Sequence, residues 1–228
     1  MRRLTLAIGG VLAAAATTLG VTAPAAAQET ASVYVVHGIP GTPVDVYVDG
    51  ARLLDDFQPS SAAGPVDVPS GAHEVALFPA DATDGSGPPL LSATEEVPGG
   101  GNVTLVAHLT EAGQPAVTPF VNDVSPVPAG EARLVVRHTA AAPAVDVLAG
   151  GSPVISGLAN PGEKALQVPA GTVSAAVAAA GTTEPVIGPA DLDLKEGTAT
   201  FVHAIGALDA GNLDLVVVTV DGLHNTTG

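Results

Sequence analysis

The chain has 228 residues, with no cysteine, no tryptophan and a formal net charge of −16. The lack of cysteine excludes a disulfide scaffold, a thiolate zinc site, an iron–sulfur cluster and a cysteine nucleophile. The acidic balance argues against a nucleic-acid or anionic-membrane partner, because both are negatively charged. A hydrophobic fraction of 46% is typical of a globular protein.

The first 27 residues predict a signal peptide. Arg2 and Arg3 precede an uncharged stretch over residues 4–21 that is rich in alanine and leucine. Ala25 and Ala27 fit the small-residue positions of a signal peptidase site, so we expect cleavage after Ala27. An uncleaved membrane anchor is the weaker alternative. Loss of the two arginines would leave a mature chain with a charge of −18.

The mature chain is therefore expected to be secreted or associated with the cell envelope, without a transmembrane segment. The paired arginines also raise a twin-arginine export route, although their flanking residues favour the general pathway. No cofactor is indicated by the sequence, and the expected partner is an unknown extracellular protein or envelope component.

A segment of about a hundred residues occurs twice. Residues 31–50 recur as 132–151, and the spacing from histidine to aspartate is eight residues in both copies. A repeat of this length is the size of a domain rather than of a solenoid unit. The predicted organisation is a signal peptide (1–27), a first repeat (28–125), a linker (126–131) and a second repeat (132–228).

The first repeat opens with a strand over residues 31–37. Over residues 44–49 valine then alternates with Asp45, Tyr47 and Asp49, as in a half-buried strand. No stretch after Ala27 has a convincing helical period. We predict an all-β fold of two tandem antiparallel immunoglobulin-like β-sandwich domains, each with roughly seven strands. Further strands are expected at 73–78, 103–108, 116–121, 172–177, 198–203 and 213–220.

Residues 35–50 read Val-Val-His-Gly-Ile-Pro-Gly-Thr-Pro-Val-Asp-Val-Tyr-Val-Asp-Gly, and Val-Pro-Ser-Gly follows at 68–71. This pattern resembles the signature of the bacterial family called domain of unknown function 4397. The resemblance extends to the second copy and implies an exported β-sandwich protein, with no activity assigned. Gly38-Ile39 and Thr139-Ala140 replace the usual Ala-Ser of the family, so no role of that serine is carried over.

His37 with Asp45, and His138 with Asp146, are the candidate catalytic residues. An aspartate that orients a histidine makes it a general base, as in a hydrolase triad. The structural interpretation is favoured, because the pair is duplicated and both loops lack a serine nucleophile; each side chain would then bond loop backbone groups. The hydroxyls nearest in sequence to the first pair belong to Ser32, Thr42 and Ser70.

Asp81 and Asp84 lie in an acidic, glycine-containing loop that offers oxygen ligands to calcium. The second repeat has lost both aspartates, so a solvated turn is the favoured interpretation, with a calcium-stabilised surface module as an alternative. A zinc site would need His37, His108 and a third histidine. Aligned at an offset of 96 residues, His108 and His203 are expected on opposite strand faces, which argues against such a duplicated site.

Carbohydrate binding has little support, because sugar sites usually present exposed aromatic rings. Tyr34 and Tyr47 are the candidate rings, and Tyr47 is expected to be exposed. The sequence thus favours a non-catalytic, exported binding or scaffolding module. The alternatives are a hydrolase that uses His37 and Asp45, and the calcium-stabilised module.

Overall fold

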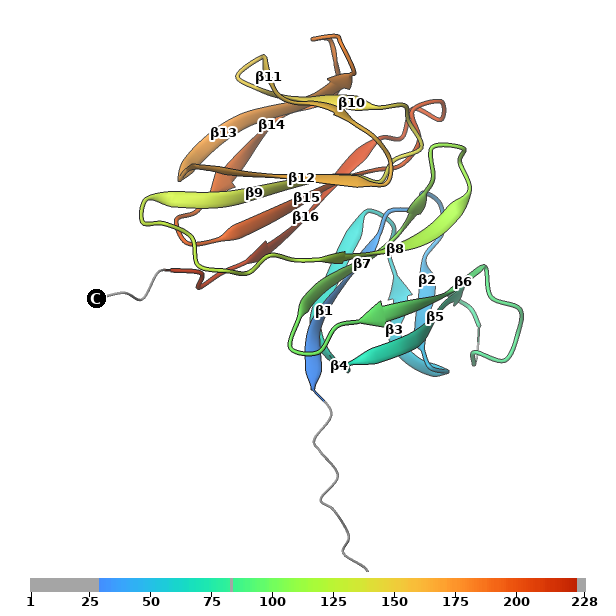
Figure 1. Ribbon diagram of the computed structural model, residues 1–228. Helices are drawn as coiled ribbons and strands as arrows, with labels where there is room; N and C mark the ends of the chain where they lie inside the picture. Colours follow the sequence, from blue (N-terminus) through green and yellow to red (C-terminus); the bar gives the residue numbers. More distant parts are fainter. Residues whose placement is uncertain (1–28, 83, 225–228) are drawn as a thin grey trace, which may run out of the picture.

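The computed structural model describes residues 29–82 and 84–224, which fold into sixteen β-strands and no helix (Figure 1). The strands form four sheets of four strands each. The predicted all-β class with two β-sandwiches is confirmed. The predicted signal peptide lies outside the described residues.

Each repeat contributes eight strands rather than the expected seven. Those of the first repeat are β1 (Thr30–His37), β2 (Val44–Val48), β3 (Ala51–Phe57), β4 (Ser61–Pro69), β5 (Gly71–Pro79), β6 (Leu91–Val97), β7 (Asn102–Leu109) and β8 (Pro115–Val121). Those of the second are β9 (Glu131–His138), β10 (Val145–Ala149), β11 (Ser152–Leu158), β12 (Gly162–Pro169), β13 (Gly171–Ala179), β14 (Pro185–Leu194), β15 (Ala199–Ile205) and β16 (Asp214–Val220).

The two repeats have the same topology. The first has sheets ordered β4-β1-β7-β8 and β3-β2-β5-β6, and the second has β12-β9-β15-β16 and β11-β10-β13-β14. Neighbouring strands are antiparallel, as expected, except that β1–β7 and β9–β15 are parallel. Parallel neighbours need a long connection, and here five intervening strands supply it.

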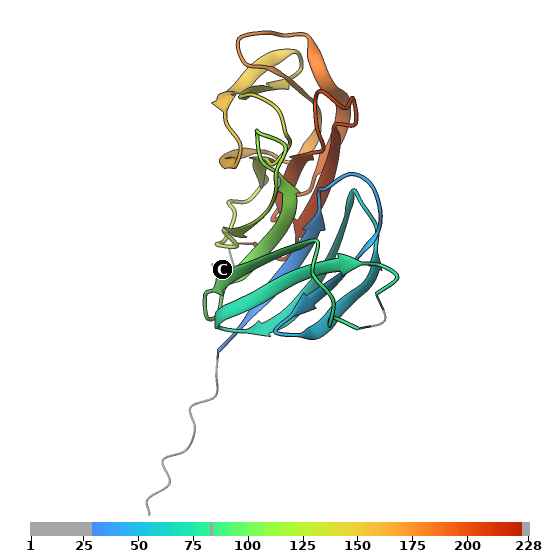
Figure 2. The same cartoon turned by 90° about the vertical axis from the view of Figure 1, so that its right-hand side faces the viewer.

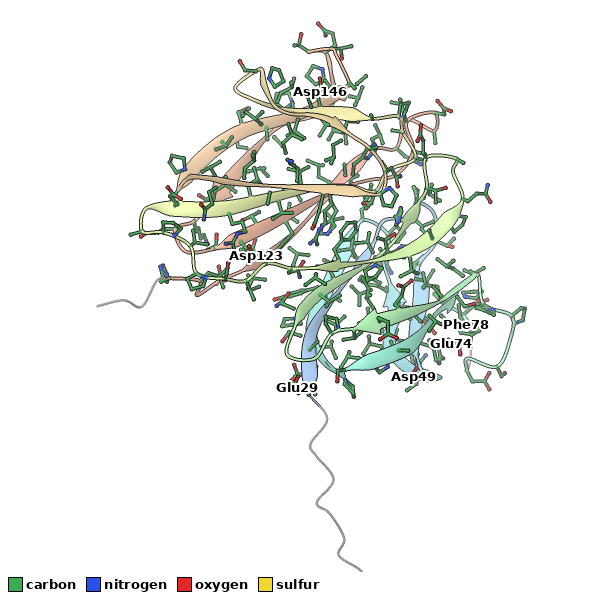
Figure 3. All side chains as sticks on the ribbon, in the orientation of Figure 1. Glu29, Asp49, Glu74, Phe78, Asp123 and Asp146 are labelled. Carbon is green, nitrogen blue, oxygen red and sulfur yellow. The ribbon has the colours of Figure 1, made fainter. Side chains whose placement is uncertain are left out.

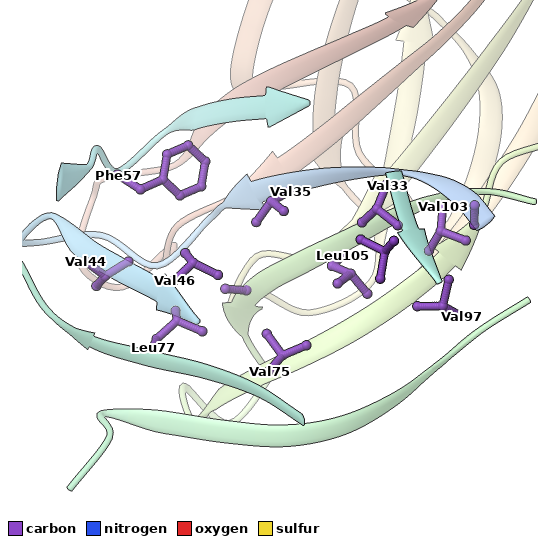
Figure 4. Close-up of a cluster of buried hydrophobic side chains, with 13 residues drawn as sticks. Val33, Val35, Val44, Val46, Phe57, Val75, Leu77, Val97, Val103 and Leu105 are labelled. Atoms are coloured by element: carbon purple, nitrogen blue, oxygen red, sulfur yellow. The ribbon is translucent and has the colours of Figure 1, made fainter. Parts of the chain in front are cut away.

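Aliphatic side chains fill the space between the two sheets of each repeat. In the first sandwich Val33 and Val35 of β1 meet Val103 and Leu105 of β7, with Phe57 at one end (Figure 4). The second sandwich has an equivalent core built mainly from valine, leucine and isoleucine. Burial of this apolar surface is the main driving force for each sandwich.

A third apolar cluster joins the sandwiches to each other. It combines Val36, Val106 and Phe120 of the first repeat with Phe201 and Val216 of the second. Sheet β4-β1-β7-β8 therefore packs against sheet β12-β9-β15-β16, and the other two sheets lie outside them (Figure 2). The central strands are buried on both faces, which explains their nearly continuous apolar sequences.

The segment that connects the repeats lies against the second sandwich. Arg133 of β9 donates to the carbonyl oxygens of Asp123 and Ser125, at 2.8 and 3.0 Å. The backbone N–H of Val127 donates to the carbonyl oxygen of Leu223 at 2.6 Å, and Val127 is buried. These contacts fix both ends of the short connection.

A substitution of Gly38 can test how closely the two sandwiches approach each other. A Cβ atom at this position would lie 2.8 Å from Cγ2 of Ile205, across the interface. Such overpacking usually costs about 1–3 kcal/mol, so Gly38→Ala should lower the free energy of unfolding by that amount in equilibrium urea titrations. Gly87→Ala is the control, because its Cβ meets nothing within 4 Å. Equal stabilities of the two variants would contradict this packing.

Candidate functional site

His37 and Asp45 lie at the first turn of the sandwich, and both side chains are buried. The Nε2 atom of His37 is 3.4 Å from the carbonyl oxygen of Thr42. Asp45 instead accepts a hydrogen bond from the backbone N–H of Asp56 at 2.9 Å and one from Arg52 at 3.3 Å. Each side chain thus has its own partners on a neighbouring loop or strand.

The second copy repeats this arrangement with better geometry. His138 donates from Nε2 to the carbonyl oxygen of Pro143 at 2.9 Å. Asp146 accepts hydrogen bonds from the backbone N–H groups of Gly157 and Gly181, both at 2.8 Å (Figure 3). In both copies the histidine fixes the loop after its strand, and the aspartate fixes backbone groups that neighbouring strands leave unpaired.

The three candidate hydroxyl groups occupy different surroundings. Thr42 contacts His37 through its backbone carbonyl oxygen. Ser32 lies within β1, paired with both β4 and β7. Ser70 donates its backbone N–H to the carbonyl oxygen of Glu29 at 2.7 Å. Within the described residues, neither ring nitrogen of His37 bonds to a hydroxyl group.

One nitrogen of each of these histidines has no hydrogen-bond partner. Nδ1 of His37 and Nδ1 of His138 are buried and unpaired. Burial lowers the pKa of both rings, which favours the neutral form. Since Nε2 donates to a carbonyl oxygen, the neutral ring leaves Nδ1 as an acceptor.

The acidic loop after β5 is exposed at Asp81 and Asp84. Asp84 accepts hydrogen bonds from the hydroxyl and the backbone N–H of Ser86, and these lower the pKa of its carboxyl group. Within residues 29–82 and 84–224, no three metal-ligating side chains lie close enough to hold an ion. Calcium binding here stays a prediction.

Tyr47 does not form the expected exposed platform. Its side chain is buried, and its ring meets the ring of Phe78 edge-on at a centroid distance of 5.1 Å. A Cβ atom at Gly85 would lie 2.9 Å from the Tyr47 ring, so the loop after β5 packs on it. The expectation was wrong because strand alternation gives no information about a loop that covers the outer face.

His108 and His203 lie on the same interface rather than on opposite faces. The pairings of β1 with β7 and of β9 with β15 place Val103 and Thr200 at equivalent positions, an offset of 97 rather than 96 residues. The one-residue difference reverses the face of every side chain in the strand. Both histidines therefore face the opposite sandwich. His108 bonds through Nε2 to the hydroxyl of Thr118, on the neighbouring strand β8 of its own sheet, at 2.8 Å.

The interface also contains Arg137, a fully buried cation that the sequence did not single out. Its guanidinium group donates to Glu163 Oε2 at 2.9 Å and to Asn122 Oδ1 at 2.8 Å. It also lies between the rings of Phe120 and Phe201, at 4.5 and 4.7 Å from their centroids. Asn122 and Phe120 belong to the first repeat, so this residue of β9 connects the two sandwiches.

His203 completes these contacts, which we call the Arg137 network. Nη1 of Arg137 is 3.2 Å from Nε2 of His203, and Nδ1 of His203 is 3.2 Å from the carbonyl oxygen of Val216. Arginine is always a donor, so Nε2 must accept and Nδ1 must carry the proton. Burial and the neighbouring guanidinium lower the pKa of His203 to about 3 and keep it neutral.

A second arrangement that the sequence did not indicate joins His73 to Asp49. Nδ1 of His73 is 2.6 Å from Asp49 Oδ2, and Nε2 is 2.7 Å from the carbonyl oxygen of Pro69. Two acceptors on the two ring nitrogens favour the imidazolium form. The hydrogen bond that Nδ1 of His73 donates to Asp49 is the main reason that the pKa of His73 is raised.

These residues also line a shallow groove of about 300 Å³ along β3 and β4, together with Arg52 and Asp67. The second repeat has Gly150 and Val173 in place of Asp49 and His73. A search for duplicated residues therefore passes over this pair.

The fold and these contacts define a protein of two packed β-sandwiches. Its buried charged and imidazole groups form hydrogen bonds to backbone and side-chain groups of the same chain. The sequence model of the family described as "Domain of unknown function (DUF4397)" matches residues 31–148. The chain belongs to this family. The match spans the first sandwich and extends through β9 into β10, so it includes both histidine–aspartate pairs.

Other comparisons add little. No curated protein matches the chain. Among solved structures, the chain is similar to the TIE protein of Bacillus anthracis, with 15% sequence identity and a TM-score of 0.22. The similarity covers 77% of this chain and 33% of that one, so the chain spans about a third of the length of that protein. A similarity this low supports no conclusion about function.

His203 predicts acid sensitivity of the interface. Its pKa is about 3 in the fold and ordinarily 6.5, so the unfolded chain binds this proton more tightly. Protonation of the unfolded chain therefore does not reduce the free energy of unfolding well above pH 6.5, but reduces it progressively as the pH falls from 6.5 towards 3. Between pH 6.5 and 4 the wild type should lose about 3 kcal/mol relative to His203→Gln, which retains an acceptor but does not titrate. Parallel stability profiles in urea titrations would contradict this.

His73 should have the opposite pH dependence. Its raised pKa stabilises the fold below the ordinary value of 6.5, and this contribution is lost as the pH rises through the folded pKa. An NMR titration of the His73 ring should show a pKa above 6.5 in the wild type and a lower one in Asp49→Asn. An unchanged pKa in Asp49→Asn would show that the pair does not set the charge of His73.

Proposed function

We propose that this protein is exported and acts outside the cell, or at the envelope, as a non-catalytic binding or scaffolding module. The observation that carries the proposal is that both histidine–aspartate pairs form hydrogen bonds to backbone groups of the fold. In each copy the histidine bonds a loop carbonyl oxygen, and the aspartate accepts from backbone N–H groups. A general base needs its free nitrogen directed at the reacting proton, whereas these nitrogens are buried.

The packing of the two sandwiches also supports a scaffolding role. The apolar interface and the Arg137 network hold the inner sheets together, so the outer sheets, edges and loops have a fixed relative position. A fixed arrangement lowers the entropy cost when one partner contacts both repeats.

Surface features available to such a partner lie along the strand edges. Besides the groove at β3 and β4, an open groove of about 480 Å³ lies along β11 and β12. No helix within the described ranges is long and apolar enough to cross a membrane. We infer a partner that is an extracellular protein or an envelope component.

Export is tested by the N-terminus of the protein made in a bacterial host. The full chain with a C-terminal tag should appear in the medium or the envelope fraction with Gln28 as its first residue, measured by intact mass. Ala27→Pro should block processing and leave the precursor. An intact chain of 228 residues confined to the cytoplasm would contradict the proposed location.

The non-catalytic role is tested with the purified mature chain and panels of ester, glycoside and peptide substrates. We expect no turnover above that of the His37→Ala variant. Turnover that His37→Ala abolishes, in a variant that keeps the wild-type fold by circular dichroism, would instead support the hydrolase.

A further inference from the structure

β16 is an edge strand of the inner sheet of the second sandwich (Figure 1). It pairs with β15 without a register shift, and no described strand pairs with its other side. Its counterpart in the first repeat, β8, contains Pro115 and Pro119, whereas β16 contains no proline. An edge strand without such protection presents backbone N–H and C=O groups with which another strand can pair.

The prolines of β8 indicate which backbone groups of β16 are directed outwards. Val217 occupies in β16 the position that Pro119 occupies in β8. Within a regular sheet, proline is found in edge strands where its nitrogen faces away from the neighbouring strand. Val217 therefore directs its N–H and C=O away from β15, as do the residues two positions before and after it. The carbonyl oxygen of Val216 agrees with this alternation, since it lies 3.2 Å from Nδ1 of His203 in β15.

The same edge leaves apolar side chains partly uncovered. Leu215 packs against the core of the second sandwich, so Val217, two residues further on, points to the same side, and it is 44% exposed. In the first sandwich β6 lies against β8 and covers the corresponding side. Its counterpart β14 does not approach β16 in this way within the described residues. The second sandwich is therefore less closed at this edge than the first.

Two small apolar spaces lie beside this edge. A cavity of about 20 Å³ has Leu192 and Leu215 among its lining residues. A cavity of about 50 Å³ beside His138 has Val186 and Leu213 among its lining residues. Protein cores are normally filled to a high packing density, so apolar side chains added from outside would extend the core at this point.

The surroundings of the edge are acidic. Asp214 and Asp221 are exposed at the two ends of β16, and Asp191 and Asp193 are exposed on β14. Neither strand contains a lysine, an arginine or a histidine. The whole chain has a net charge of −16, so a second copy of it would be repelled here, whereas a basic segment would be attracted.

We propose that β16 binds an extended segment of a partner protein, which adds to the sheet as a further strand and has alternating aliphatic residues with basic residues at its ends. Outward backbone groups of β16 supply the hydrogen bonds. The aliphatic side chains cover Val217 and the side of the strand that faces β14, and the basic ends meet Asp214 and Asp221. This inference rests on the proposed binding role, to which it assigns a site, and it does not depend on export.

The probe is the peptide acetyl-Lys-Val-Thr-Val-Thr-Val-Lys-amide, which has the same length as the seven-residue strand β16. Titrated into the ¹⁵N-labelled mature chain, it should cause saturable shifts of the backbone amides of Leu215, Val217 and Thr219 and slow their exchange with solvent. The same peptide with glutamate in place of both lysines should bind at least about tenfold more weakly. No saturable binding of the lysine peptide, or equal affinities of the two peptides, would overturn the proposal.

Val217→Pro places in β16 the proline that β8 has at this position. It removes an outward N–H and leaves the bonds to β15 in place, so the circular dichroism spectrum should be retained while the peptide binds at least about tenfold more weakly. If Val217→Pro does not fold, Val217→Lys serves instead, because an inward-pointing charge on an edge strand also opposes pairing. Pro119→Val is the matched control and should bind the peptide as the wild type does. Unchanged affinity in the folded β16 variant would contradict the proposed site.

Light scattering after size-exclusion chromatography tests the other occupant, a second copy of the chain. We expect the wild type to be monomeric. A dimer that Val217→Lys dissociates would show that β16 pairs with itself and would overturn the proposal. Failure of the peptide to bind would remove this edge as a site without affecting the non-catalytic role, which the substrate panels test separately.

Discussion

The structure depends on the burial of one guanidinium group between two sheets. A cation removed from water is strongly destabilising unless charges and hydrogen bonds compensate it, and Arg137 has Glu163, Asn122 and two aromatic rings as partners. Those partners come from both repeats, so they are complete only when the sandwiches are in this one arrangement. Separation would expose the apolar cluster and leave Asn122 without its cationic donor. Apolar burial supplies most of the attraction, and the Arg137 network determines the register.

Duplication preserved the features that the fold requires and changed those that it does not. Both copies retain the histidine at the end of the first strand and the aspartate that binds backbone N–H groups, because the turns would otherwise leave polar groups unpaired. Outside these positions the copies diverge. Among the described residues, the ion pair of His73 with Asp49 has no counterpart in the second sandwich, which has Val173 and Gly150 at these positions. Differences between the copies are therefore better guides to specific function than the conserved pairs are.

The repeat and the alternating valines predict the fold class well, because both depend on local residue order. The packing of the two sandwiches against each other could not be predicted in this way. Strand alternation separates two faces, but it does not say whether water, a loop or another sheet covers each one. An arginine in a strand usually indicates a face exposed to solvent, but Arg137 is buried. Tyr47 was expected to be exposed because it alternates with apolar residues of its strand, but it is buried too. The faces of His108 and His203 needed the observed pairings, since a one-residue error in alignment inverts a strand.

The two least expected features of the molecule are carried by neighbouring residues. Arg137 and His138 follow one another in β9, and successive side chains of a strand point to opposite faces. The guanidinium group therefore faces the other sandwich, whereas the imidazole faces the interior of its own. Because β9 is buried on both sides, a displacement of this strand at the cavity would also change the distances from Arg137 to Asn122 and His203. The same strand thus links the cavity wall of the second sandwich to its contact with the first.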